Sequence, residues 1–220
     1  MKNEPIYENN ELYTAFPDPD EVFYSEVEKE RFLPLGTFHL QTDEGQHDVL
    51  IATPLGDEEG LIGKDNYGEF CGETWLTYSK VNGKWKMDCS VDDLLNFDAY
   101  YEKANNGLKE AKKIFNENKC LPSRSSRGDG KIPLFSIQSY PSYLYNWFSD
   151  VEEYFNFALR EVDKEELDSS FDEDKAVTLF DSEGNQYVYI GSTNKSFLMA
   201  RLFFFYNVKA ERVLVIFEYS

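Results

Sequence analysis

Histidine and cysteine are the residue types that most often perform chemistry, and this chain contains few of them. His39 and His47 are the only histidines, with Asp43 and Asp48 close by in the sequence. Together the four could form a small metal site, but their spacing suits neither one helix face nor a cross-strand set of ligands. We therefore assign no metal ligand. If the turn at 42–45 has four residues, His39 faces Asp48 across a hairpin.

Signatures of nucleophilic or phosphate chemistry are absent from the sequence. The chain has no phosphate-binding glycine loop, no nucleophile elbow and no zinc-peptidase motif. Cys71, Cys89 and Cys120 lack the spacing of a metal clamp or redox motif, so we expect isolated, reduced, structural thiols. The acidic segment 181–185 lacks the final glutamate of a calcium-binding loop and predicts a hairpin turn. We assign no catalytic residue and no cofactor.

Carboxylates are the abundant reactive groups, and they define the candidate partner-binding surface. The chain carries 41 acidic against 22 basic side chains, a net charge of −19. Segment 161–174 places eight acidic residues around one lysine. The acidic candidates are Glu161, Asp163, Glu165, Glu166, Asp168, Asp172, Glu173 and Asp174. This charge predicts a basic protein partner and disfavours nucleic acid and anionic membranes, since binding to either requires positive charge.

Aromatic side chains are dense just before this acidic segment. They make up 16% of the chain, and eight of them fall between positions 140 and 157. Phe148 and Phe155 belong to an apolar stripe with helical spacing, whereas Tyr145 and Trp147 lie partly off it. Two interpretations stay open for Tyr145 and Trp147. They either pack against a sheet or form a recognition patch beside the acidic segment.

Strands are predicted where short apolar runs flank turn-forming residues. The Asn82-Gly83 pair is the strongest of these turn signals, and its register sets Tyr78 opposite Met87. The run 213–217 does not alternate and predicts a central strand covered on both faces. For 196–205 a helix is an alternative to a strand. The expected strands are 35–41, 48–53, 74–81, 84–89, 176–180, 186–191, 197–206 and 212–219.

Helices are predicted between these two groups of strands. Ser90 is the expected N-cap of a helix over 91–103, which ends at the Asn-Asn-Gly sequence 105–107. A second helix is expected over 108–117. Apolar residues spaced three or four apart predict a third helix over 143–162. That apolar stripe consists of Leu144, Phe148, Val151, Phe155, Leu159 and Val162.

These elements predict an α+β fold, with antiparallel sheets built from hairpins. Two or three helices are inserted between the N-terminal and C-terminal strand groups. The 220 residues form either a single domain or two lobes that meet near 119–133. The first residues lack the apolar core of a signal peptide, and the longest apolar stretch, 197–206, is too short to span a membrane. We expect a soluble cytoplasmic protein, and the sequence sets no oligomeric state.

The sequence favours a non-enzymatic protein-binding module, such as an inhibitor or immunity-type protein that engages a basic partner. Acidic nuclease inhibitors and bacterial immunity proteins share this size and composition, which is an analogy of class and not a matched motif. The alternative is a small-ligand-binding protein or a hydrolase with carboxylate and tyrosine side chains in a cleft. Salt-sensitive association would indicate the protein-binding module. A buried carboxylate with a raised pKa would indicate the ligand-binding protein or hydrolase.

Overall fold

The computed structural model describes residues 4–57, 59–123, 130–137, 140–163, 166–167, 175–193 and 200–218. The helical elements are α1 (Pro19–Val22), α2 (Glu26–Arg31), the 3₁₀ turn η1 (Val91–Asp93), α3 (Asp98–Asn118) and α4 (Asn146–Val151). The strands are β1 (Glu4–Ile6), β2 (Tyr13–Ala15), β3 (Phe32–Thr42), β4 (Gly45–Pro54), β5 (Trp75–Val81), β6 (Lys84–Met87), β7 (Leu121–Pro122), β8 (Lys131–Ile132), β9 (Phe135–Ile137), β10 (Asn156–Arg160), β11 (Ala176–Phe180), β12 (Gln186–Ser192), β13 (Arg201–Asn207) and β14 (Arg212–Glu218).

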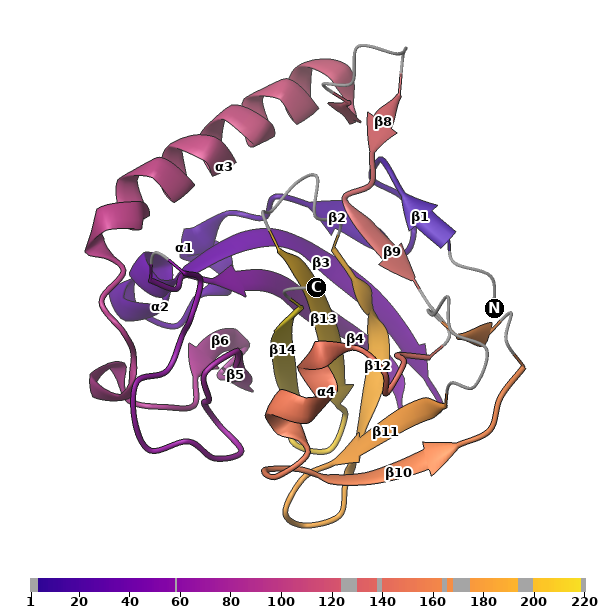
Figure 1. The fold of residues 1–220 in the computed structure, drawn as a ribbon. Helices are drawn as coiled ribbons and strands as arrows, with labels where there is room; N and C mark the ends of the chain where they lie inside the picture. The colour runs from indigo at the N-terminus through magenta and orange to yellow at the C-terminus, as the bar shows by residue number, and fades with distance from the viewer. Residues whose placement is uncertain are drawn as a thin grey trace.

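The largest sheet places the C-terminal strands at its centre (Figure 1). Its strand order is β1-β9-β12-β13-β14-β5-β6, and β10 and β11 extend it beside β12. A second sheet has the order β2-β3-β4, and β7 pairs with β8. The strand pairs in these sheets are antiparallel. The α+β class is therefore confirmed, in a form richer in strands than in helices.

Alternate residues of the central strands enter two separate apolar cores. In β13, Leu202 and Phe204 face the first core, whereas Phe203 and Phe205 face the second. The first core lies between the large sheet and the β2-β3-β4 sheet, and includes Tyr13, Phe32, Phe38, Ile51, Tyr78, Phe115, Phe135, Leu202, Phe204, Val213 and Val215. The second core lies on the opposite face of the large sheet, and comprises Trp75, Trp147, Phe148, Val151, Phe155, Val177, Leu179, Tyr187, Phe203, Phe205, Leu214 and Ile216.

Turn chemistry sets the register of two hairpins. Both residues of Asn82-Gly83 have positive φ, at 52° and 81°, which a tight hairpin turn between right-twisted strands requires. Tyr78 consequently pairs with Met87. In the β3–β4 hairpin, His39 pairs with Asp48. Both pairings agree with the sequence prediction because they depend on residues that are close in the chain.

The C-terminal strand is central and covered on both faces, as its non-alternating sequence predicts. Strand β14 lies between β13 and β5, and every residue after Arg212 is buried. Residues 201–207 form a strand paired on both edges, so the alternative helix over 196–205 is wrong in this described part. The part of that prediction at 196–199, and residues 219–220, lie outside the described residues.

The predicted pair of helices over 91–117 is wrong in its boundaries. Ser90 and Asp93 form the expected capping box, but the helix they begin is one 3₁₀ turn. The chain then leaves the helical path because Leu94 is buried and forms a bridge with Gly63. Helix α3 starts later and runs through the Asn-Asn-Gly sequence at 105–107. Each of those residues costs about 1 kcal/mol or less in a helix interior, which packing of Phe115 into the first core outweighs.

The predicted helix over 143–162 is also wrong. Only α4 is helical, and after a turn the chain continues as β10. Residues 156–160 pair along their whole length with β11, so long-range hydrogen bonding replaces the helix suggested by local spacing. Phe148, Val151 and Phe155 of the predicted stripe are buried as expected, while Leu144 and Leu159 are exposed.

None of the helices in the described part of the chain combines the length and apolar character needed to cross a membrane. Around the expected lobe boundary at 119–133, β7 pairs with β8 and brings both sides of the segment together. Positions 124–129 of that boundary lie outside the described residues.

Candidate functional site

Helix α4 is fixed over the large sheet by groups that are distant in sequence. Its N-cap, Tyr145, makes no side-chain capping hydrogen bond. The buried carboxylate of Glu218 on β14 accepts a hydrogen bond from the Trp147 backbone N–H at 3.0 Å. A negative charge at a helix N-terminus is favourable. Near the other end, the Thr74 hydroxyl donates to Asp150 at 2.7 Å. The start of α4 could not be predicted from a local capping residue, because the capping group is Glu218, which is distant in the sequence.

The aromatic residues of α4 have different exposures. Trp147 is fully buried, its ring lies 5.5 Å from that of Phe205, and its Nε1 donates to the Ser142 carbonyl at 3.0 Å. Tyr145 is half-buried, and its ring lies 6.2 Å from Phe203. The structure therefore gives Trp147 no surface for a partner, and its role here is to hold α4 on the second core.

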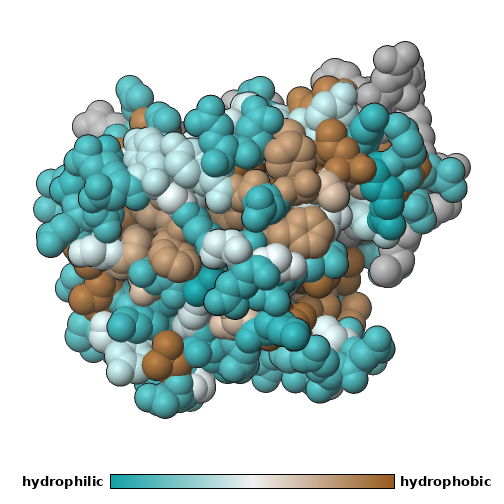
Figure 2. All heavy atoms as spheres, turned by 90° about the horizontal axis from the view of Figure 1, so that it is seen from below, coloured by the Kyte–Doolittle hydropathy of each residue, from teal (hydrophilic) through white to brown (hydrophobic). Residues whose placement is uncertain are grey.

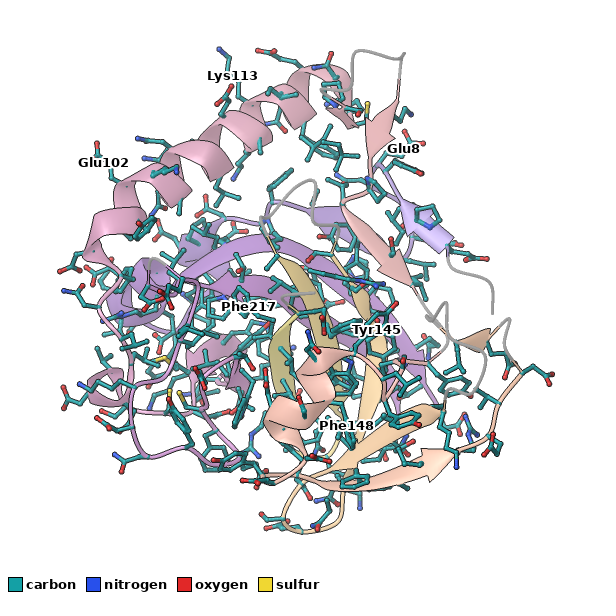
Figure 3. All side chains as sticks on the ribbon, viewed as in Figure 1. Glu8, Glu102, Lys113, Tyr145, Phe148 and Phe217 are labelled. Atoms are coloured by element: carbon teal, nitrogen blue, oxygen red, sulfur yellow. The ribbon has the colours of Figure 1, made fainter. Side chains whose placement is uncertain are left out.

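The second core continues outward from α4 onto β10. Phe148 lies between α4 and the β10–β11 strands (Figure 3), with its ring 5.0 Å from and perpendicular to that of Phe157. Phe157 and Leu159 sit opposite Leu179 and Val177 of β11, which are both buried in the second core. The apolar face of the sheet thus extends past its cover to the edge strand.

The exposed end of this face is the candidate binding surface, and we call it the α4–β10 rim. It consists of Phe157 and Leu159, which are each 42% exposed. Figure 2 shows the side of the molecule on which β10 lies, where brown apolar areas interrupt the teal polar surface. The rim was not predicted from the sequence, although Phe157 and Leu159 alternate with polar or small residues as in a strand.

The predicted acidic residues that the structure describes lie directly after β10. Glu161 and Asp163 are exposed, and Glu166 is partly buried. Glu161 forms an exposed ion pair with Lys175 at 3.1 Å, a contact that contributes little to stability. Glu165, Asp168, Asp172, Glu173 and Asp174 lie outside the described residues.

Two further carboxylates precede the strand. Glu152 and Glu153 are exposed in the turn between α4 and β10. Across 150–163 the sequence holds five acidic side chains and one basic side chain, Arg160. The guanidinium of Arg160 lies over the ring of Tyr140, 4.4 Å from its centre. The α4–β10 rim is therefore framed by negative charge on both sides of β10.

A separate polar cluster brings carboxylates and a tyrosine together around Arg212. The guanidinium of Arg212 donates to Glu69 at 3.2 Å and to Asp88 at 3.1 Å. Burial raises the pKa of the nearby Tyr187 hydroxyl well above its usual range, and the positive charge of Arg212 acts in the opposite direction. Since both carboxylates accept hydrogen bonds from the same guanidinium, this cluster suits the attachment of β14 to the neighbouring segments better than proton transfer.

The two histidines do not converge. His39 hydrogen bonds with Asp48 at 2.7 Å and with the Thr14 hydroxyl at 3.0 Å. His47 lies on the opposite face of the hairpin, 3.4 Å from the Tyr206 hydroxyl. Among the described residues, no cluster of three or more histidine, cysteine or acidic side chains is arranged to hold a metal ion.

Two of the cysteines, expected to be isolated, are neighbours in the fold. Interaction with the Cys89 thiol lowers the pKa of Cys71, while burial acts in the opposite direction. The same interaction, together with burial, raises the pKa of Cys89. Both are free thiols, as is Cys120. The spacing of Cys71 and Cys89 in the sequence carried no signal of this contact.

No protein-family model, curated protein or solved structure matches this chain.

Proposed function

We propose that this protein is a non-enzymatic binding module of the inhibitor or immunity type, which engages a basic protein partner in the cytoplasm. The observation that carries the proposal is the α4–β10 rim, where Phe157 and Leu159 are exposed between acidic segments. Interfaces of this kind combine apolar anchors, which slow dissociation, with complementary charge, which accelerates association.

Negative charge at the rim selects the class of partner. A protein carrying lysine and arginine side chains would be attracted by Glu152, Glu153, Glu161 and Asp163. The attraction extends over about 8 Å at physiological ionic strength and weakens as salt is added. A basic partner is therefore expected to associate quickly at low salt and to be retained by contact with Phe157 and Leu159.

The experiment that tests this function compares two charge reversals of equal size. In the rim variant, Glu152, Glu153, Glu161 and Asp163 are changed to lysine. The matched control variant changes four exposed acidic residues elsewhere, which are Asp43, Glu44, Glu102 and Glu110. Each variant, and the unmodified chain, is used to capture proteins from the native lysate at low and moderate salt, with circular dichroism to verify folding.

We expect one basic protein to be retained in near-stoichiometric amount by the unmodified chain and by the control variant. The rim variant should lose it at both salt concentrations. Equal retention by the two variants, or equal loss from both, would contradict the assignment of binding to the rim. Retention of no protein at all would contradict the proposed function itself.

A further inference from the structure

Strand β10 forms the free edge of the large sheet in the described part of the chain. It pairs with β11 on one side, and no described strand pairs with its other side. All five of its residues are exposed, and Figure 1 shows the strand at the periphery of the fold. An edge of this kind presents a row of backbone N–H and C=O groups that can hydrogen bond to another strand.

The direction of these backbone groups follows from the hydrogen bonds of β11. The Val177 N–H donates to the Pro141 carbonyl at 3.1 Å, and the Lys175 carbonyl accepts from the Tyr143 N–H at 3.2 Å. Odd-numbered residues of β11 therefore direct their backbone groups away from β10. Because the direction alternates along a strand, the even-numbered residues of β11 face β10.

The strand register carries this alternation across to β10. Asn156, Ala158 and Arg160 lie opposite the even-numbered residues of β11 and direct their backbone groups inward. Phe157 and Leu159 must then direct their N–H and C=O groups outward, away from β11. The two residues whose side chains form the exposed apolar face also carry the backbone groups that are available for pairing.

Proteins usually protect such an edge with proline, lysine, a bulge or a covering segment. Strand β10 contains neither proline nor lysine, and its pairing with β11 runs through all five residues with no bulge. Its one charged residue, Arg160, lies over the Tyr140 ring. The free edge of β10 therefore has none of these features in the strand itself, and its backbone groups can pair with another strand.

Charge distinguishes between the possible occupants of this edge. Glu152 and Glu153 precede β10, and Glu161 and Asp163 follow it. A second copy of β10 paired in antiparallel fashion would place the acidic residues after one strand beside those before the other, which is repulsive. An extended segment with lysine or arginine side chains would instead find opposite charge at both ends.

We propose that β10 binds an extended basic segment of the partner as an additional antiparallel strand. The segment hydrogen bonds to the backbone of Phe157 and Leu159, packs alternate apolar side chains on the α4–β10 rim, and places basic side chains near the flanking carboxylates. This inference rests on the proposed function, because it specifies how the basic partner is held. Backbone pairing supplies affinity, while the side chains of the segment supply specificity.

The probe is a short synthetic peptide in which lysine and valine alternate, because it combines strand propensity, positive charge and one apolar face. Binding is measured by titration at low salt, and the site is located by hydrogen exchange of backbone amides. We expect the amides of Phe157 and Leu159 to exchange rapidly in the free protein and slowly in the complex. Two N-methylated isomers of the peptide serve as controls. Methyl groups on the lysine nitrogens block hydrogen bonding along one edge of the peptide, and methyl groups on the valine nitrogens block it along the other.

Two variants at one position separate backbone pairing from side-chain contact. Leu159→Pro removes an outward N–H while leaving the hydrogen bonds to β11 intact, as proline is tolerated on the free side of an edge strand. Leu159→Thr removes the same apolar side chain but keeps the N–H. We expect Leu159→Pro to bind the peptide about tenfold more weakly than Leu159→Thr, the change expected from one lost hydrogen bond.

We expect the unmodified chain to bind the peptide and the amides of Phe157 and Leu159 to be protected from exchange in the complex. We also expect the roughly tenfold difference in affinity between the two Leu159 variants, and binding of only one of the two N-methylated isomers. The isomers keep the test valid if Leu159→Pro fails to fold. Binding of both isomers with equal affinity, protection elsewhere, no binding, or a dimer of the chain paired through β10 would overturn the inference.

The outcomes also separate this inference from the proposed function. If a basic protein is captured through the rim, and the Leu159→Pro variant captures it as well as the Leu159→Thr variant does, the result would support the function and overturn strand addition. Edge-dependent peptide binding without capture of any basic protein would support strand pairing at β10 and contradict the proposed function.

Discussion

The two apolar cores lie on opposite faces of the same sheet and are closed by very different covers. A second sheet, β2-β3-β4, covers the first core, whereas the six-residue helix α4 is the main cover of the second. The first core is therefore covered by a complete three-stranded sheet. The second extends beyond its cover and ends at the α4–β10 rim.

The same kind of side chain serves two purposes in this molecule. Phe204 in the first core is fully buried and contributes only to stability, while Phe157 at the end of the second is 42% exposed. An exposed apolar edge carries a cost in solubility, which the dense carboxylates around β10 reduce. Because the second core is incompletely covered, its exposed end, the α4–β10 rim, is a candidate for binding.

Removing a ring from the first core should give the largest effect. Phe204→Ala should lower the free energy of unfolding by about 3–5 kcal/mol, because it removes a buried aromatic side chain and leaves a cavity. Phe157→Ala at the rim should cost about 1 kcal/mol or less. Chemical denaturation of both variants provides the measurement, and equal losses would show that the rim is as tightly packed as the first core.

Removing the Glu218 carboxylate that caps α4 should cause an intermediate loss of stability, confined to the second core and the α4–β10 rim. Glu218→Ala leaves the buried Trp147 N–H without its carboxylate acceptor, which should cost about 1–3 kcal/mol. Hydrogen exchange should accelerate in α4 and β10 while β3 and β4 stay protected. Glu218→Gln keeps an acceptor oxygen and should lose less stability. Unchanged exchange in α4 of Glu218→Ala would show that the cap does not hold the helix.

Acid should lower stability through Asp181 in the turn between β11 and β12, with the smallest effect of the three. Burial alone would raise the pKa of Asp181, but hydrogen bonds from Asn185, Asn207 and the Glu183 N–H outweigh it and leave the pKa below its usual range. A lowered pKa in the folded state means that Asp181 contributes stability at pH values above its unfolded pKa, about 4. That contribution is lost as pH falls through the folded value.

Asp181→Asn should therefore flatten the decline in stability below about pH 4, because the variant has no proton to take up at this position. Denaturation midpoints of the variant and the unmodified chain, measured from neutral to acidic pH, provide the test. The matched control is Asp43→Asn in the exposed β3–β4 turn, which makes the same substitution away from the hydrogen bonds of Asp181. Parallel profiles for Asp181→Asn and the unmodified chain would contradict the stabilising role of the Asp181 carboxylate.

Local signals predicted the parts of the fold that depend on neighbouring residues. The Asn82-Gly83 turn and its register could be read from sequence because both residues accept positive φ. The capping box of Ser90 and Asp93 was also predictable, yet the helix that follows it was not. Its end depends on Leu94 and Gly63, which are distant in the chain and meet only in the folded structure.

The candidate site shows the same division. Composition located the acidic segment and the aromatic cluster, and left open whether Tyr145 and Trp147 pack against a sheet or form a recognition patch. The structure buries Trp147 and exposes Leu159 instead, because a segment with helical spacing pairs with β11 as a strand. Spacing alone cannot distinguish these outcomes, since the competing hydrogen bonds come from residues far along the chain.

The net charge, the tight hairpins and the non-alternating central strand β14 follow from the sequence, because each is a property of composition or of residues in contact along the chain. The exposed edge strand at 156–160 and the capping of α4 by Glu218, 71 positions from Trp147, arise from the folded arrangement of distant segments. Both depend on pairing free energy between distant segments, which local propensity does not contain.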